Sequence, residues 1–215
     1  MSKRSLEINS YKILFWDFDG VIKESINVKT EAYVKLFENF GKELTDRVRR
    51  HHLSNGGMSR FEKIPLYANW AGLDLNKSHL NDFLDRFSKY TYQLVLNSDW
   101  VPGVENLIRT NKYNQIYIVV SATPEEELGN ILQSLNLTSC FLGCYGSPMA
   151  KSQAISECIK DYQVSPSDCL MIGDAKADLD AAKANEIDFL LRLHSFNRDV
   201  FSEYTGFIIE DFLNL

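Results

Sequence analysis

Five short runs of apolar residues recur along the chain, separated by polar segments. Each run is nearly continuous in apolar residues, which is typical of strands in a parallel sheet that is covered on both faces. The strands expected from these runs span residues 13–16, 116–120, 141–145, 169–172 and 189–193.

Segments of helical length connect the later strands. Their apolar residues recur with helical spacing and predict helices over 125–135, 151–161 and 178–185. The first of these follows Thr123-Pro124, a pair that suits the start of a helix. The alternation of strands and helices predicts an α/β fold whose core is a doubly wound parallel, Rossmann-like sheet.

Residues 23–97 have a different pattern. Apolar side chains recur there at three- and four-residue intervals, and no run is typical of a strand. The turn-forming sequence DWVPGV at 99–104 would then return the chain to the sheet. We therefore expect a Rossmann-like core made of residues 1–22 and 98–215, with an inserted α-helical cap domain at 23–97.

The composition excludes some classes of partner. The 215 residues carry a formal net charge of −6 and give a pI of about 5.3, whereas proteins that bind nucleic acid are usually basic. No apolar run approaches the roughly 20 residues that a membrane helix needs. The N-terminal sequence MSKRSLEINS lacks the apolar region of a secretory signal. We expect a cytoplasmic protein without nucleic-acid or membrane partners; the sequence indicates no oligomeric state.

The cysteines do not suggest a metal site. They form no CxxC pair, and no histidine lies between residues 80 and 193 to join Cys140 and Cys144. Reduced, buried thiols are the expectation for all four, which are Cys140, Cys144, Cys158 and Cys169.

Polar residues follow four of the expected strands. In an open α/β sheet, ligands bind outside the carboxyl ends of the strands, so these residues are candidates for one site. They are Asp17 and Asp19 after the first strand, Ser121 after the second, Lys151 beyond the third, and Asp174 and Asp178 after the fourth.

The chemistry of this set is that of phosphoryl transfer. Carboxylates brought together repel one another and raise each other's pKa, and a bound divalent cation removes that cost. Ligands that are all oxygen favour a hard ion such as Mg²⁺, which binds substrate phosphate as well. The hydroxyl of Ser121 and the positive charge of Lys151 suit phosphoryl oxygens.

The same residues resemble a known family. The segments Asp17-Phe-Asp-Gly-Val, Ser121, Lys151 and Gly-Asp174 with Asp178 match, in order, the four motifs of the haloacid dehalogenase-like hydrolase superfamily. The resemblance covers nearly the whole expected core. The helical insert after the first motif is similar to the cap of the phosphoglycolate phosphatase and β-phosphoglucomutase branch.

The resemblance implies a role for each matching residue. Asp17 would be the nucleophile that forms an aspartyl-phosphate, and Asp19 the general acid and base. The metal ion, Mg²⁺, would be held by the side chains of Asp17 and Asp174 and by the backbone carbonyl of Asp19. Lys151 would hold Asp17 and the phosphate in place.

Further roles follow in the same way. Ser121 and the N–H of Ala122 would bind the transferring phosphoryl group, and Gly20 would let the backbone approach it closely. Asp178 would assist at the edge of the metal site by orienting water or Lys151.

Asp19 favours one reaction among those of the superfamily. The family's carbon–halogen hydrolases lack this pair of aspartates, and its phosphonate-cleaving members have a smaller residue at the second position. An aspartate there can protonate a departing sugar or alkyl oxygen, so cleavage of a phosphate ester is expected.

The sequence HHLSNGGMSRFEK at 51–63 is the most unusual part of the insert. Gly56-Gly57 would destabilise a continuing helix, while Ser59 is a candidate N-cap for a new helix. The segment is either a simple turn between helices or a substrate-specificity loop, in which Arg60 or Lys63 would meet an anionic group of the substrate. The adjacent histidines, His51 and His52, are expected to be solvated or to cap the helix.

The sequence therefore predicts a Mg²⁺-dependent phosphatase that acts on a small phosphorylated metabolite, with a lean towards a sugar phosphate. Two alternatives remain. A phosphomutase of the β-phosphoglucomutase type would use the same core residues and return the phosphoryl group to a second hydroxyl. A non-catalytic regulatory or binding domain would retain the fold alone.

Overall fold

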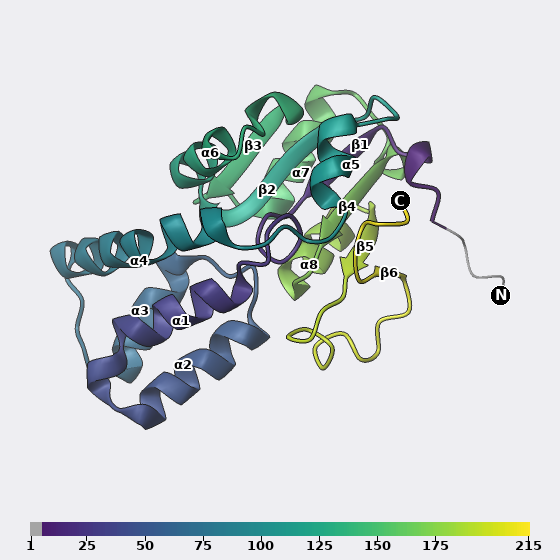
Figure 1. Ribbon diagram of the computed structural model, residues 1–215. Coiled ribbons are helices and arrows are strands. Elements are labelled where there is room, and N and C mark those ends of the chain that lie inside the picture. The colour runs from purple at the N-terminus through teal and green to yellow at the C-terminus, as the bar shows by residue number, and fades with distance from the viewer. Residues whose placement is uncertain (1–5) are drawn as a thin grey trace.

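A single parallel sheet forms the centre of the molecule (Figure 1). The structure is a computed structural model that describes residues 6–215; residues 1–5, which the sequence prediction assigned to the core, lie outside the described residues. The strand order is β3-β2-β1-β4-β5-β6, as in Rossmann-like folds, and confirms the predicted doubly wound α/β class. The strands are β1 (Ile13–Trp16), β2 (Ile116–Pro124), β3 (Gly143–Ser147), β4 (Cys169–Gly173), β5 (Asp188–Arg192) and β6 (Phe207–Ile209).

The fourth and fifth strands differ from the prediction by one residue, and three larger details of the strand prediction were wrong. The second strand continues to Pro124, so Ser121 lies within it rather than after it. The third strand is shifted by two residues towards the C-terminus. The sixth strand, β6, was not predicted, because it has only three residues and its middle residue, Ile208, is 43% exposed on the edge of the sheet.

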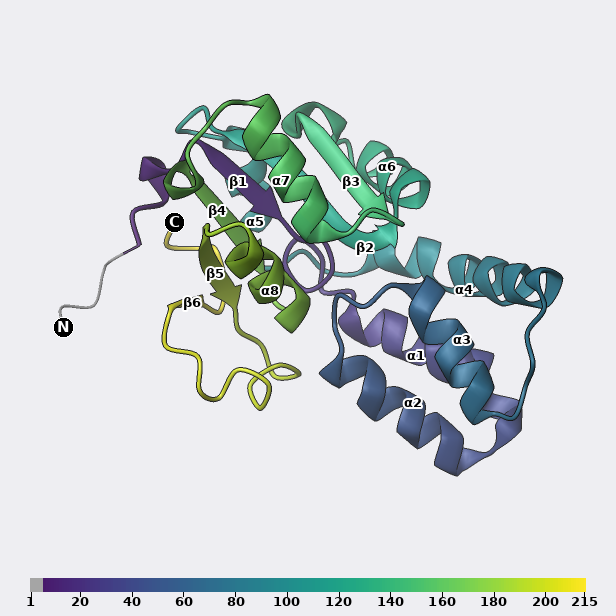
Figure 2. The same cartoon turned by 180° about the vertical axis from the view of Figure 1, so that it is seen from behind.

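Helices cover both faces of the sheet, which explains why the central strands are almost wholly apolar. Apolar residues of α5 and α6 pack on one face, and those of α7 and α8 pack on the other, where Figure 2 shows them in front. These helices are α5 (Val104–Thr110), α6 (Glu125–Ser134), α7 (Lys151–Asp161) and α8 (Lys176–Ala184). Short 3-10 turns occur at Ile8–Ser10, Glu38–Phe40, Thr138–Cys140 and Pro166–Asp168.

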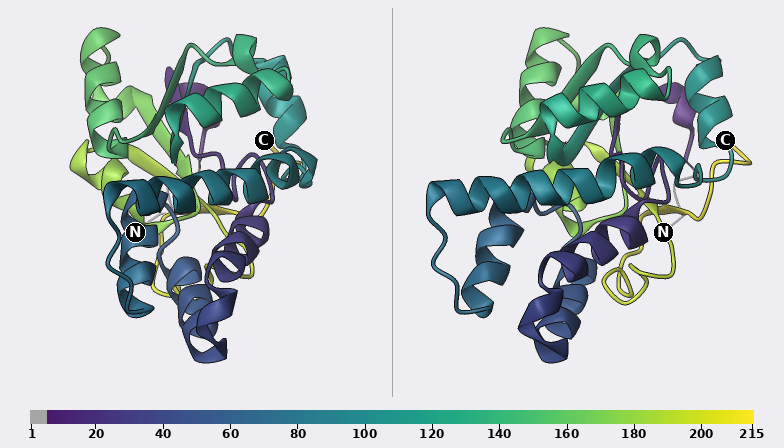
Figure 3. Two further views of the ribbon diagram at one scale, coloured as in Figure 1. Left: turned by 90° about the vertical axis from the view of Figure 1, so that its left-hand side faces the viewer. Right: turned by 60° about the vertical axis from the view of Figure 1, so that its left-hand side comes forward.

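Four helices between β1 and α5 form a separate group with its own apolar cluster. They are α1 (Ile26–Leu36), α2 (Lys42–Ser54), α3 (Arg60–Trp70) and α4 (Lys77–Asn97). Figures 1 and 3 show the group at one end of the sheet, the end towards which the strands run. Ser59 is the N-cap of α3, as predicted, and accepts a hydrogen bond from the N–H of Phe61 at 3.3 Å.

The two segments that connect this helical group to the sheet lie side by side. The Glu24 N–H donates to the Asp99 carbonyl at 2.9 Å, and the Val101 N–H donates to the Ile22 carbonyl at 3.1 Å. Lys23, between them, is only 2% exposed. Backbone hydrogen bonds therefore hold the two connecting segments together close to the end of β1.

The cysteines are free thiols, as predicted, but only Cys158 and Cys169 are buried; Cys140 and Cys144 are partly exposed. Within residues 6–215, no helix combines the length and the apolar character that crossing a membrane requires.

Candidate active site

Asp17 directly follows β1 at the centre of the sheet. Its N–H continues the ladder to β4 by donating to the Ile172 carbonyl at 2.9 Å, and its Oδ1 accepts the N–H of Phe18 at 2.7 Å. The other oxygen, Oδ2, lies 2.9 Å from Nζ of Lys151. Asp17 is only 3% exposed. Its orientation is fixed by these hydrogen bonds at the end of β1 and by the ion pair with Lys151.

Lys151 opens α7 and joins two carboxylates. Its Nζ is 2.9 Å from Asp17 and 2.5 Å from Oδ1 of Asp178. Burial alone would lower the pKa of Lys151, but the charges of Asp17 and Asp178 outweigh burial and raise it. The lysine is therefore a fixed positive charge beside the candidate nucleophile.

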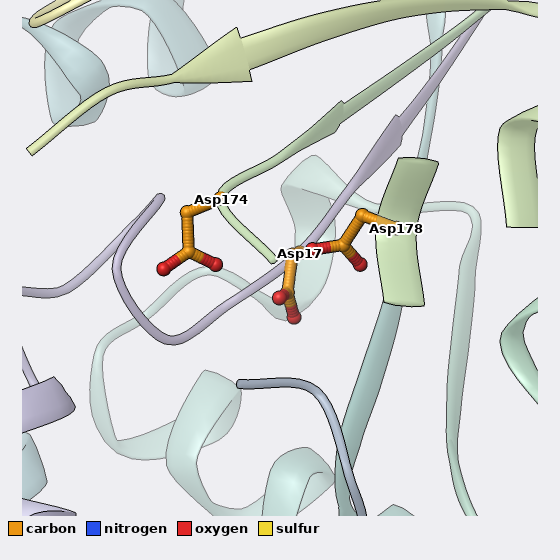
Figure 4. A group of neighbouring side chains, drawn as sticks. All are labelled: Asp17, Asp174 and Asp178. Atoms are coloured by element: carbon orange, nitrogen blue, oxygen red, sulfur yellow. The ribbon is translucent and has the colours of Figure 1, made fainter. Parts of the chain in front are cut away.

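Three buried carboxylates converge from different segments, as Figure 4 shows. Asp17 follows β1, Asp174 follows β4, and Asp178 lies in the first turn of α8; one oxygen from each lies within 4.8 Å of the others. Burial raises the pKa of all three, and that of Asp17 reaches about 7, with repulsion by Asp178 the next cause. An all-oxygen cluster of this kind fits a hard divalent cation, which would offset the repulsion.

Asp19 turns its carboxylate away from this cluster. It accepts hydrogen bonds from the Ser25 hydroxyl at 2.5 Å and the Thr123 hydroxyl at 3.2 Å, and it forms an ion pair with Lys29. Burial raises the pKa of Asp19, but the charge of Lys29 and the three hydrogen bonds outweigh it and lower the pKa below its usual value. The side chain is thus held ionised beside the cluster.

Gly20 follows with a φ of +77°, in the region that favours glycine. A Cβ at this position would overlap the carboxylate of Asp174. The residue therefore allows the loop after β1 to approach the end of β4.

A cavity of about 80 Å³ lies between the helical group and the strand ends. From the sheet side it is lined by Asp17, Asp19, Ser121, Ala122 and Asp174. The structure thus brings most of the predicted core residues to one cavity. Lys151 lines the neighbouring pocket together with Ser121 and Ala122, and it reaches the cavity through Asp17.

The two predicted cap residues differ in their environment. Nη1 and Nη2 of the Arg60 guanidinium each donate to the Glu127 carboxylate at 2.7 Å, and Nη1 also donates to the Ser88 hydroxyl at 2.7 Å. Lys63 instead contacts Nδ1 of His52 at 2.9 Å. Both Arg60 and Lys63 line the cavity, but a carboxylate already neutralises the charge of Arg60.

The prediction that His52 is solvated or a cap was wrong. The residue is 7% exposed, and its ring lies against that of Tyr33, with centroids 4.9 Å apart. Burial, and then the charge of Lys63, lowers its pKa well below the usual value. His51 lies in the last turn of α2, where Nδ1 is 3.0 Å from the hydroxyl of Tyr67.

Sequence reasoning missed four residues of the site. Lys29 and Thr123 contact Asp19, and His194 and Asn197 contact Asp174. The rule that polar residues at strand ends form a site would have found His194, because it lies two residues beyond β5. No comparable signal marks Lys29, whose contact depends on how α1 packs.

The fold and these carboxylates define a class of protein, a Rossmann-like α/β protein with an acidic site at the strand ends. The family model of haloacid dehalogenase-like hydrolases matches residues 11–185. The chain belongs to this family, which confirms the resemblance predicted from its four motifs.

Relatives with curated names agree with this assignment. A phosphorylated carbohydrates phosphatase from Thermotoga maritima is 24% identical over 194 residues, covering 86% of each chain. A phosphoglycolate phosphatase from Colwellia psychrerythraea is 24% identical over 200 residues, covering 89% of this chain and 88% of the relative. These matches, together with the family, confirm the prediction of a phosphoric monoester hydrolase.

A solved structure shares the fold. The crystal structure of CbbY from Rhodobacter sphaeroides, in complex with xylulose 1,5-bisphosphate, superimposes with a TM-score of 0.75 at 14% identity, covering 95% of this chain and 96% of the other. At this level of identity the likeness concerns the fold alone.

Proposed function

We propose that the protein is a Mg²⁺-dependent phosphatase that hydrolyses a small phosphorylated metabolite through an aspartyl-phosphate on Asp17. The observation that carries this proposal is the position of the Asp17 carboxylate. It is buried at the end of β1, paired with Lys151 and within reach of Asp174 and Asp178, and it lines the same cavity as Ser121.

Asp17, Asp174 and the backbone carbonyl of Asp19 would hold Mg²⁺, with Asp178 at the edge of the site. When bound, the ion would neutralise charge on the phosphoryl oxygens and on the carboxylates. Asp178 already accepts hydrogen bonds from Lys151 at 2.5 Å and from the Ala175 N–H at 3.0 Å, which suits a role in orienting Lys151.

In the first step a carboxylate oxygen of Asp17 forms a bond to phosphorus, while the bond between phosphorus and the leaving oxygen breaks. Asp19 gives its proton to that leaving oxygen. Ser121 and the Ala122 N–H bind the phosphoryl oxygens, and Lys151 balances their charge.

In the second step Asp19 takes a proton from water, whose oxygen attacks phosphorus as the bond to Asp17 breaks. The ion pair with Lys29 keeps Asp19 ionised and suits this role. The first step needs a proton on the same carboxylate, so it requires the contact between Lys29 and Asp19 to loosen when the negative phosphoryl group enters.

We propose that residues 23–97, with helices α1–α4, are a cap. The substrate would then be small, because the cavity between this cap and the strand ends is only about 80 Å³. Its end remote from the phosphoryl group would lie against Lys63 and His52. The names of the two curated relatives support a sugar phosphate or a phosphorylated acid. Of these, we propose a sugar phosphate, whose hydroxyl oxygens can accept from Lys63.

Phosphate release tests the proposal. The wild-type protein should release phosphate from members of a panel of sugar phosphates, phosphorylated acids and nucleotides with Mg²⁺, and EDTA should abolish the release. Asp17→Asn should be inactive while its far-ultraviolet circular dichroism is unchanged. A phosphomutase would instead isomerise a sugar phosphate and release little phosphate. Full activity of Asp17→Asn would refute the mechanism.

A further inference from the structure

His194, just beyond β5, contacts the carboxylate of Asp174. Its Nε2 is 2.9 Å from Oδ2 of Asp174, and the side chains are 9% and 8% exposed. The pair is therefore largely shielded from water. A hydrogen bond to a carboxylate is stronger in such a buried site than in water.

A second contact fixes which ring nitrogen carries the proton. The backbone N–H of Phe196 donates to Nδ1 of His194 at 3.1 Å. Nδ1 must therefore be an acceptor without a proton, which places the proton of the neutral ring on Nε2. His194 consequently donates to Asp174 rather than accepting from it.

The same loop also holds the backbone of Asp174. The amide of Asn197 donates to the Asp174 carbonyl at 2.8 Å and to the Arg192 carbonyl at 3.0 Å. Its oxygen accepts the N–H of His194 at 2.8 Å. Residues 192–197 thus fix both the main chain and the carboxylate of Asp174.

The hydrogen bond distinguishes the two oxygens of Asp174. Oδ2 accepts from His194, whereas Oδ1 accepts no hydrogen bond from residues 6–215. Oδ1 is therefore the oxygen left to a cation.

We propose that His194 is a positioning residue for the metal site, and that its Nε2–H orients Asp174 so that the free oxygen coordinates Mg²⁺. This inference rests on the proposed Mg²⁺ site. Hydrogen bonds of this kind to a metal ligand typically contribute about 10- to 100-fold to metal affinity.

Mg²⁺ binding to the full-length protein tests the inference. Calorimetric titration with Mg²⁺ alone, and the shift in Tm that Mg²⁺ produces, should show about 10- to 100-fold weaker binding in His194→Ala than in the wild type. At saturating Mg²⁺ the variant should recover most of its kcat. A matched control is His79→Ala, because His79 is exposed on α4; it should bind Mg²⁺ like the wild type.

Two amide variants separate the hydrogen bond from a structural role and serve if the alanine variant does not fold. The amide of His194→Gln can reach the position of Nε2 and should restore much of the affinity. The amide of His194→Asn reaches only the position of Nδ1 and should not. Unchanged affinity in His194→Ala, or equal affinity in the two amide variants, would overturn the inference. Failure of the wild type to bind Mg²⁺ would instead overturn the proposed function.

Discussion

Replacing Lys63 with methionine should remove a large part of the pH dependence of stability between pH 7 and pH 10. Lys63 is 1% exposed, and it forms no salt bridge within residues 6–215. Burial, and then the nearby charge of Lys29, lowers its pKa from 10.5 to about 7, although Asp19 opposes the shift.

The sign follows from the number of bound protons. Between pH 7 and pH 10 the unfolded chain keeps Lys63 protonated, while the folded protein has released that proton. The unfolded state binds more protons, so the free energy of unfolding rises with pH across this window. Each pKa unit corresponds to about 1.4 kcal/mol, so the three units of this window amount to roughly 4 kcal/mol.

Urea unfolding at a series of pH values measures this contribution of Lys63 to the free energy of unfolding. The free energy of unfolding of the wild type minus that of Lys63→Met should increase by roughly 4 kcal/mol from pH 7 to pH 10. His52 titrates below this window, so it does not contribute. Lys42→Met removes an exposed lysine and should leave the profile unchanged. A difference between wild type and Lys63→Met that is constant with pH would refute the reasoning.

Three further predictions concern stability and the site. Arg60→Leu removes the ion-pair partner of Glu127, whose side chain is 13% exposed and keeps only the Ser88 hydroxyl as a donor. The variant should lose about 3–5 kcal/mol in urea unfolding, and adding Glu127→Leu should recover most of the loss; a loss below about 1 kcal/mol in the single variant contradicts this reasoning. Gly20→Ala places an alanine at a left-handed φ and makes its Cβ overlap with Asp174. The variant should lose about 1–3 kcal/mol of unfolding free energy and its phosphatase activity; full activity would contradict this prediction. Asn76→Ala removes the N-cap of α4 and should cost about 1 kcal/mol in thermal unfolding; an unchanged Tm would mean that water replaces the cap.

The core could be predicted from the sequence because its signals are local. The continuous apolar run at 13–16 produces β1, and the acids that follow it must lie at the end of the sheet. The same argument led to Ser121, Lys151 and Asp174. The edge strand β6 was not predicted because it is short and partly exposed. Helix α5 was not predicted either, because it has only seven residues.

Contacts between the helical group and the sheet could not be predicted, because they depend on packing. One of the two interpretations of residues 51–63 had Arg60 or Lys63 meeting a substrate anion. In the structure α3 and α6 meet so that Nη1 and Nη2 of Arg60 donate to Glu127. His52 looked solvated beside His51, and only the arrangement of α1 and α2 buries it against Tyr33.

The most direct test of the account is to identify the residue that carries the phosphoryl group. With nitrophenyl phosphate, whose leaving group needs little protonation, Asp19→Asn should still be phosphorylated but should lose the base that activates water. Mass spectrometry of the acid-quenched variant should then find phosphate on Asp17, after a burst of about one nitrophenolate per enzyme. The account would be contradicted if the wild type turns over the substrate but the variant carries phosphate on another residue. It would also be contradicted if the wild type turns over and no phosphorylated variant is found.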